Sequence, residues 1–174
     1  MAAIDDFIAV LEAYGIRRLV DVRTIPASRH NPQFKGDALA ASLATRGIGY
    51  LHMAALGGLR HARKDSPNAG WRNVSFRGYA DYMQTETFLD ALESLIEMGR
   101  KERVAIMCAE AVPWRCHRSL VADALEVRGV PAVEIFSATS WRMHALTPFA
   151  RVEGTTITYP PEQGGLGFNL KWNM

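Results

Sequence analysis

Short apolar segments alternate with single amphipathic helices along this chain, and this alternation constrains the fold more than any other feature. The clearest strand is predicted at Val104–Cys108, and others at Leu19–Arg23, Ile48–Met53 and Ala132–Phe136. Parallel neighbours joined by single helices require right-handed crossovers, and such sheets are covered on both faces. The sequence therefore predicts an α/β fold with a mainly parallel sheet in three layers.

The helices that connect these strands show apolar residues at helical spacing and recognisable ends. They are expected at about 4–15, 37–47, 85–99 and 117–128, with Gly15, Gly47 and Gly129 as stops and the third helix ending near Gly99. Towards the end of the sequence, Phe149–Val152 and Thr155–Tyr159 flank Glu153-Gly154, which predicts a β-hairpin.

Length and composition fit one soluble domain. The chain has 174 residues, of which 48% are hydrophobic, enough for a core without metal or disulfide support. We expect a single domain over 1–160 and a flexible tail over 161–174. No apolar run reaches the roughly 20 residues of a membrane helix, and the start lacks signal-peptide features. The sequence thus favours a cytoplasmic protein without membrane contact. Its two cysteines are expected as thiols, with a regulated disulfide left open.

Charge is distributed unevenly although the net charge is only +2. Residues 17–77 hold eleven Lys or Arg against three Asp, a balance of +8, and the rest of the chain balances at −6. A basic half beside an acidic half indicates an anionic partner such as phosphate or nucleic acid. A solvated surface of mixed charge is the alternative.

Polar groups gather where three predicted strands end. Arg23 follows the first strand and His52 the second, while Cys108 and Glu110 follow the third. Ligands of parallel sheets bind beyond the carboxyl ends of the strands. The next helix begins near Cys116-His117-Arg118, so its free amides are expected at the same edge.

Two cysteines at this edge are candidates for catalysis. A reactive thiol needs a lowered pKa, which arginine, histidine or a helix N-terminus supplies. Cys116 has Arg115, His117 and Arg118 beside it, and His117 or Glu110 is the predicted proton-transfer group. A buried structural role for Cys108 is the alternative. The phosphatase-type Cys-x5-Arg loop is absent from the sequence.

Metal binding by this cluster is a second alternative, because Cys with His suits zinc. The Cys-x7-Cys-His spacing matches no standard zinc module, so no metal ligand set is predicted. The sequence leaves any cofactor unassigned.

The predicted anion site consists of guanidinium and smaller polar groups at the sheet edge. For Arg23, the alternative to anion binding is a structural ion pair with Asp21 or Glu110. For His52, the alternative is a core histidine hydrogen-bonded to the backbone. The predicted residues are Arg23, Ser28, Arg29, His52 and Arg118.

One long insert, residues 57–78, is expected to be irregular and mixes aromatic residues with cations. Single-stranded nucleic acids are bound by this combination, through stacking and backbone charge. Packing of Phe76, Tyr79 and Tyr82 into a local core is the favoured alternative for those three residues, and Trp71 stays open.

Four separated motifs together resemble the bacterial domain-of-unknown-function 488 family over about residues 4–160. They are DVRTIPASRHNPQF, GIGYLHMAALGGLR, NAGWRNVSFRGYADYM and CAEAVPWRCHRSLVADAL. The resemblance implies a compact α/β domain and no particular reaction. The residues that match the family pattern are Asp21, Arg23, Pro26, Ser28, His52, Gly57, Gly58, Asn73, Phe76, Tyr79, Cys108, Glu110, Cys116, His117 and Arg118.

The resemblance also brings one departure. Family members usually begin with a strand carrying a Thr-Ile-Gly-His-Ser type motif, whereas this sequence begins at the following helix. We therefore expect a sheet with one strand fewer, a site without that His and Ser, and exposed sheet edges that favour a homo-oligomer.

Together these patterns predict an enzyme with an anion-binding crevice and a reactive cysteine, acting on a phosphorylated or nucleic-acid substrate. The alternatives are a non-catalytic nucleic-acid-binding module and a metal-binding Cys/His protein.

Overall fold

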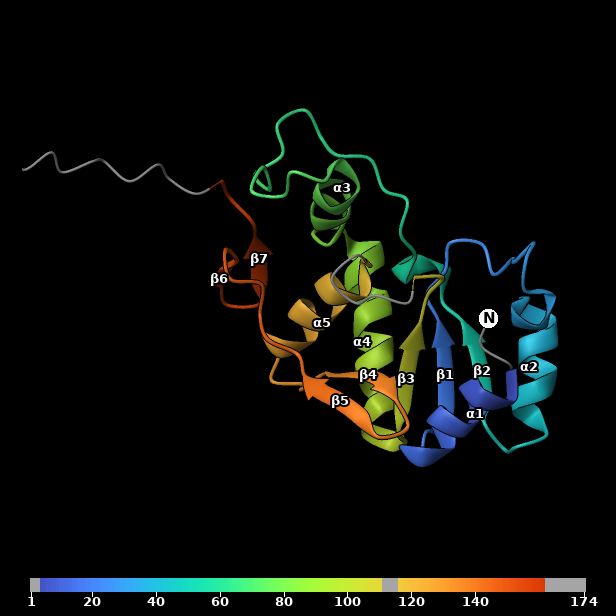
Figure 1. The fold of residues 1–174 in the computed structure, drawn as a ribbon. Coiled ribbons are helices and arrows are strands. Elements are labelled where there is room, and N and C mark those ends of the chain that lie inside the picture. The colour runs from blue at the N-terminus through green and yellow to red at the C-terminus, as the bar shows by residue number, and fades with distance from the viewer. Residues whose placement is uncertain (1–3, 111–115, 162–174) are drawn as a thin grey trace, which may run out of the picture.

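The computed structural model describes residues 4–110 and 116–161 and has a three-stranded parallel sheet at its centre (Figure 1). The strands are β1 (Arg18–Asp21), β2 (Gly49–His52) and β3 (Val104–Met107), in the order β2-β1-β3. Arg18 pairs with Gly49 on one side and with Val104 on the other. The α/β fold and its parallel sheet are as predicted, and all three strands end at the same edge.

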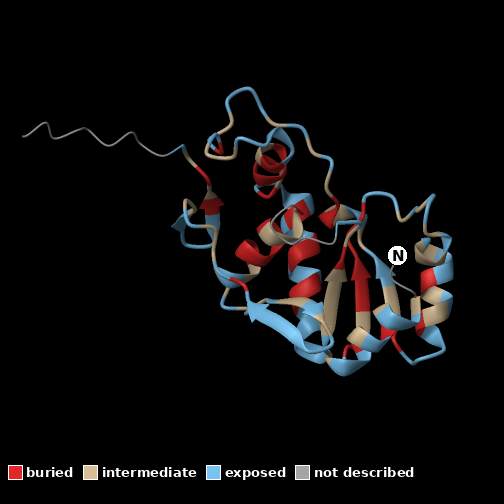
Figure 2. Ribbon diagram, in the orientation of Figure 1, coloured by how far each residue is buried: buried red, intermediate tan, exposed pale blue. Residues whose placement is uncertain are grey.

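Helices cover both faces of this sheet. The core on one face combines Leu19 with residues of α1 (Ile4–Ala13) and α2 (Gly36–Ala44), and the core on the other combines Val20 with residues of α3 (Val74–Tyr82), α4 (Glu86–Lys101) and α5 (Arg118–Glu126). Successive side chains of a strand point to opposite faces, so neighbours in β1 serve different cores. Figure 2 shows the buried residues of β1 between these two helical layers.

Helix ends largely follow the sequence signals. Gly15, Gly47 and Gly129 all have positive φ, the left-handed conformation that glycine adopts without strain. Thr85 caps α4 by accepting a hydrogen bond from the Phe88 amide. The sequence predicts that this helix ends near Gly99, and α4 continues two residues further, to Lys101. A single glycine lowers helix stability by only about 1 kcal/mol, which the buried apolar face of α4 outweighs.

The fourth predicted strand exists but does not join the parallel sheet. Strand β4 (Val133–Ser137) pairs antiparallel with β5 (Ser140–Met143), a strand the sequence analysis did not predict. Two residues separate β4 from β5, so the nearest partner along the chain is available through a tight turn. Val133 is 46% exposed, unlike a strand covered on both faces. The predicted hairpin is confirmed as β6 (Arg151–Glu153) and β7 (Thr156–Thr158).

The predicted insert is irregular over residues 57–73, as expected, and helix α3 begins inside it at Val74. Two short 3-10 turns lie outside the insert, η1 (Pro32–Phe34) after β1 and η2 (Ala54–Leu56) after β2. The Asn73 side chain starts helix α3 by accepting hydrogen bonds from the amides of Ser75 and Phe76. The Asp81 carboxylate in α3 accepts hydrogen bonds from the Arg63 amide, the Ser66 hydroxyl and the Asn68 amide group, which anchors the preceding loop.

Within 4–110 and 116–161, no helix is both long and apolar enough to cross a membrane. Strands β2 and β3 lie at the two edges of the parallel sheet in this part of the chain. All but the first residue of the predicted tail, 161–174, lies outside the described residues.

Candidate functional site: a cysteine pair at the sheet edge

The fold brings together the two cysteines that the sequence separates by seven residues. Cys108 follows β3 directly, and Cys116 lies just before α5. The sulfur atoms of Cys108 and Cys116 and a ring nitrogen of His117 all lie within 4.8 Å of one another. The predicted convergence of these three residues is therefore present in the structure, because a strand end and the start of the following helix meet at one edge.

Hydrogen-bond donors surround the sulfur of Cys116, a residue only 2% exposed. The Arg118 backbone amide lies 3.5 Å from this sulfur and the Arg118 Nε 3.3 Å, while His117 Nδ1 lies 3.8 Å away. The hydrogen bond from the Cys108 thiol contributes most, and with the His117 and Arg118 contacts it lowers the pKa of Cys116 to about 4 in spite of burial. Cys116 is thus the thiolate of the pair.

Cys108 is the protonated partner. Its hydrogen bond to the Cys116 sulfur, together with burial, raises the pKa of Cys108 above the ordinary value. The Glu110 amide donates a hydrogen bond to the Cys108 sulfur over 3.2 Å. Cys108 is half-buried. The pair therefore shares one proton, which stays on Cys108.

His117 has a fixed orientation. Its Nε2 lies 3.2 Å from the Val22 carbonyl oxygen, which can only accept, so Nε2 carries a proton. The imidazole ring lies 4.9 Å from the Tyr79 ring, and a Cβ on Gly58 would come within 3.1 Å of Nδ1. Gly58 and Tyr79 thus hold the ring with Nδ1 facing Cys116.

Arg118 connects the pair to its surroundings. Besides the contacts to Cys116, its guanidinium donates to the Glu110 carbonyl oxygen. Glu110 contributes backbone groups here and is itself exposed. Helix α5 begins without a side-chain cap on its first amides, which adds partial positive charge next to Cys116.

Arg23 was predicted as an anion ligand, with a structural ion pair as the alternative. In the structure it forms that ion pair, with Asp21. Its guanidinium donates to both carboxylate oxygens of Asp21 and to the Phe34 carbonyl oxygen. Asp21 is fully buried and Arg23 is 6% exposed. Burial raises the pKa of Asp21, but hydrogen bonds from Arg23 and Tyr50 outweigh it, so this pKa lies below its ordinary value.

Three further predicted anion-binding residues lie around the β1–α2 connection. Ser28 accepts a hydrogen bond from the Asn31 amide, Arg29 is exposed, and His52 Nε2 donates to the Arg23 carbonyl oxygen over 2.7 Å. Among the described residues, Arg118 is the one member of the predicted anion-binding set that hydrogen-bonds the cysteine pair.

The aromatic residues of the predicted insert pack inward. Phe76 and Tyr79 are 8% and 1% exposed, as the core alternative expected. The Trp71 ring contacts Phe76, and the Arg60 guanidinium covers the Tyr82 ring at 3.7 Å. These contacts leave little aromatic surface for stacking with nucleic-acid bases.

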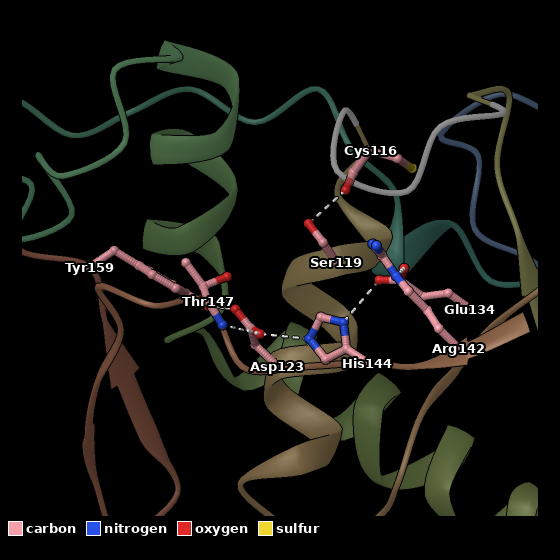
Figure 3. A network of polar contacts seen from close by, with 8 residues as sticks. All are labelled: Cys116, Ser119, Asp123, Glu134, Arg142, His144, Thr147 and Tyr159. Atoms are coloured by element: carbon pink, nitrogen blue, oxygen red, sulfur yellow. Dashed lines mark hydrogen bonds and ion pairs between the residues drawn. The ribbon is translucent and has the colours of Figure 1, made fainter.

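Sequence reasoning missed a buried polar network on the same helix (Figure 3). Asp123, fully buried in α5, accepts hydrogen bonds from His144, the Tyr159 hydroxyl and the Thr147 amide. His144 also contacts Glu134. The network ties the C-terminal segments to the helix that carries Arg118. The sequence signal that could have indicated this network is Asp123 itself, an acidic residue between apolar positions of the helix.

Cys108, Cys116 and His117 are of the types that bind soft divalent cations, and their spacing would admit one. The Arg118 guanidinium, however, already hydrogen-bonds the Cys116 sulfur and brings positive charge to it. These nitrogen donors stabilise an anionic sulfur, and their positive charge disfavours the binding of a metal cation at the same place.

Comparisons with known proteins give partial matches to relatives and a match to a family model. The chain is 32% identical over 142 residues to part of the 1,4-alpha-glucan branching enzyme GlgB 2 of Rhizobium johnstonii and of Rhizobium etli. In each case the match covers 62% of this chain and 19% of the enzyme. No solved structure is significantly similar. A family model described as "Domain of unknown function DUF488" matches residues 3–125, and the chain therefore belongs to the DUF488 family.

Proposed function

We propose that this protein is an enzyme whose nucleophile is the Cys116 thiolate and whose substrate carries a phosphate group. The single observation that carries the proposal is the pair of Arg118 donors on the Cys116 sulfur, the backbone amide at 3.5 Å and Nε at 3.3 Å. Sulfur with this environment is ionised at neutral pH, and the thiolate is the reactive form of cysteine.

The positive charge around the sulfur supports an anionic substrate. A guanidinium beside an uncapped helix start is a common phosphate-binding arrangement. Cys108 and Arg118 are each partly exposed beside the covered Cys116, so a substrate would approach from their side.

Proton transfer would fall to Cys108. The Cys116 sulfur would attack phosphorus, and the departing alcohol oxygen would take the Cys108 thiol proton. Water would then cleave the sulfur–phosphorus bond and return a proton to Cys108. His117 would stay oriented through the hydrogen bond from its Nε2 to the Val22 carbonyl oxygen, which keeps its ring in contact with Cys116.

Competition between inorganic phosphate and iodoacetamide tests this proposal. Phosphate is expected to slow alkylation of Cys116 in the wild-type protein and to lose that effect in Arg118→Gln. Arg100→Gln, which removes an exposed arginine in the last turn of α4, is the matched control and should retain protection. Hydrolysis of an aryl phosphate should disappear in Cys116→Ser. Alkylation unaffected by phosphate in the wild-type protein would contradict the proposal.

Nucleic-acid binding without catalysis remains the alternative prediction. It expects affinity that falls steeply with salt concentration and is unchanged when both cysteines are alkylated. The branching activity in the relatives' name supplies no argument here, since this chain spans 19% of those enzymes.

A further inference from the structure

The site contains a second thiol that a single nucleophile does not require. The Cys108 and Cys116 sulfur atoms lie within 4.8 Å of each other, close enough for the ionisation of one to affect the other. One sulfur is ionised and the other protonated, which is the state that sequential two-thiol chemistry needs. Each sulfur also accepts a backbone amide, from Glu110 and from Arg118 respectively.

We propose that this pair reduces hydroperoxides, with Cys116 as the attacking thiolate and Cys108 as the thiol that resolves the oxidised product into a disulfide. The inference rests on the ionised Cys116 of the proposed function. It adds a second class of substrate and a covalent role for Cys108.

The Cys116 thiolate attacks one peroxide oxygen, the O–O bond breaks, and Cys116 becomes a sulfenic acid. The departing hydroxide takes the Cys108 proton and leaves as water. The Cys108 thiolate then attacks the Cys116 sulfur and expels hydroxide, which takes a proton from solvent. Two thiols lose two electrons to the peroxide, and an external dithiol returns them by reducing the disulfide.

Burial favours this substrate class. Cys116 is 2% exposed, so the electrophile that reaches its sulfur with least rearrangement is small. Hydrogen peroxide is small and polar, and the nitrogen donors of Arg118 lie 3.3 and 3.5 Å from the attacking sulfur, where they can stabilise the departing oxygen.

The position of its sulfur, within 4.8 Å of the Cys116 sulfur, favours Cys108 as the resolving thiol. A disulfide requires the two sulfurs to approach to about 2.05 Å. Cys108 follows β3 and is half-buried, so its side chain is less enclosed than that of Cys116 and is the one expected to move.

Stoichiometric hydrogen peroxide followed by peptide mass spectrometry tests the proposal on the full chain. Wild-type protein should lose two hydrogens and yield one linked peptide pair containing Cys108 and Cys116, reversed by dithiothreitol. Cys108→Ser should stop at a Cys116 sulfenic acid that dimedone captures. Cys116→Ser should consume peroxide far more slowly and form no intramolecular disulfide.

Each outcome separates this inference from the proposed function. Rapid acid-range alkylation of Cys116 without a Cys108–Cys116 disulfide after peroxide would overturn the inference and leave the thiolate nucleophile standing. Disulfide formation only between molecules would also overturn it. If Cys116 also resists alkylation in acid, both proposals fail. Wild-type disulfide mapping needs no variant, so a misfolded serine variant leaves the test intact.

Discussion

Replacing Arg23 with methionine tests whether this residue belongs to the framework or to the site. Arg23 is 6% exposed and neutralises the fully buried Asp21 through several hydrogen bonds. The substitution keeps much of the side-chain volume but leaves a buried carboxylate whose remaining side-chain donor is the Tyr50 hydroxyl.

Removing one partner of a buried ion pair lowers the free energy of unfolding by about 3–5 kcal/mol, and we expect this range for Arg23→Met at pH 7.5. Arg29→Met is the control, because an exposed arginine in the same connection should change stability by no more than about 0.5 kcal/mol. Asp21→Leu combined with Arg23→Met removes both charges and should restore part of the loss.

Urea unfolding followed by circular dichroism measures these differences, and pH adds a second check. In the wild-type protein the pKa of Asp21 is lowered, so its stabilising contribution is present above the unfolded value of about 3.9 and is lost as pH falls. In Arg23→Met the Asp21 carboxyl has lost its cationic partner and binds a proton more readily. The loss in free energy of unfolding relative to wild type should therefore be smaller at pH 4.5 than at pH 7.5. A loss below about 1 kcal/mol at pH 7.5 would refute the structural role.

Two further substitutions probe the frame around the site. The hydrogen bond to Asp123 outweighs burial and raises the pKa of His144, so its contribution to stability is full below about pH 6.5 and is lost as pH rises through the folded-state pKa. The unfolding free-energy difference between wild type and His144→Gln should therefore shrink from pH 5.5 to pH 9 in urea titrations, and a constant difference would contradict this. Gly99 lies inside α4, and a Cβ there would meet nothing within 4 Å. Gly99→Ala should stabilise the protein by about 0.5–1 kcal/mol, seen as a higher Tm, and a lower Tm would contradict the helix assignment.

The sequence predicts those features that depend on local pattern and strand direction. Parallel strands must end at one edge, so the meeting of Cys108 with Cys116 and His117 follows from their places after a strand and before a helix. Glycine at helix ends has an equally local cause, and Gly15 confirms it.

What the sequence does not predict depends on pairing choices and on which polar groups become buried. An apolar run such as Val133–Ser137 fits either a parallel sheet or a local hairpin, and the tight turn to β5 decides the matter. Arg23 lies near the sheet edge in either role, and only the side-chain contacts assign it to Asp21. The Asp123–His144 contact joins distant segments, so neither residue alone indicates it.

The pH dependence of iodoacetamide alkylation at Cys116 and Cys108, resolved by peptide mass spectrometry, tests the ionised thiolate most directly. A thiolate of low pKa is intrinsically less nucleophilic, with a Brønsted coefficient of about 0.4–0.5, so the shape of the profile is the informative quantity rather than the absolute rate. An ordinary thiol of pKa about 8.5 is only about 0.3% ionised at pH 6.

We predict that the alkylation rate at Cys116 stays level from pH 8 down to pH 6 and declines only in more acidic solution, while Cys108 reacts in alkaline solution alone. A chelator should leave the Cys116 profile unchanged. A Cys116 rate that falls about tenfold for each pH unit between pH 8 and pH 6 would show an ordinary thiol and contradict the account.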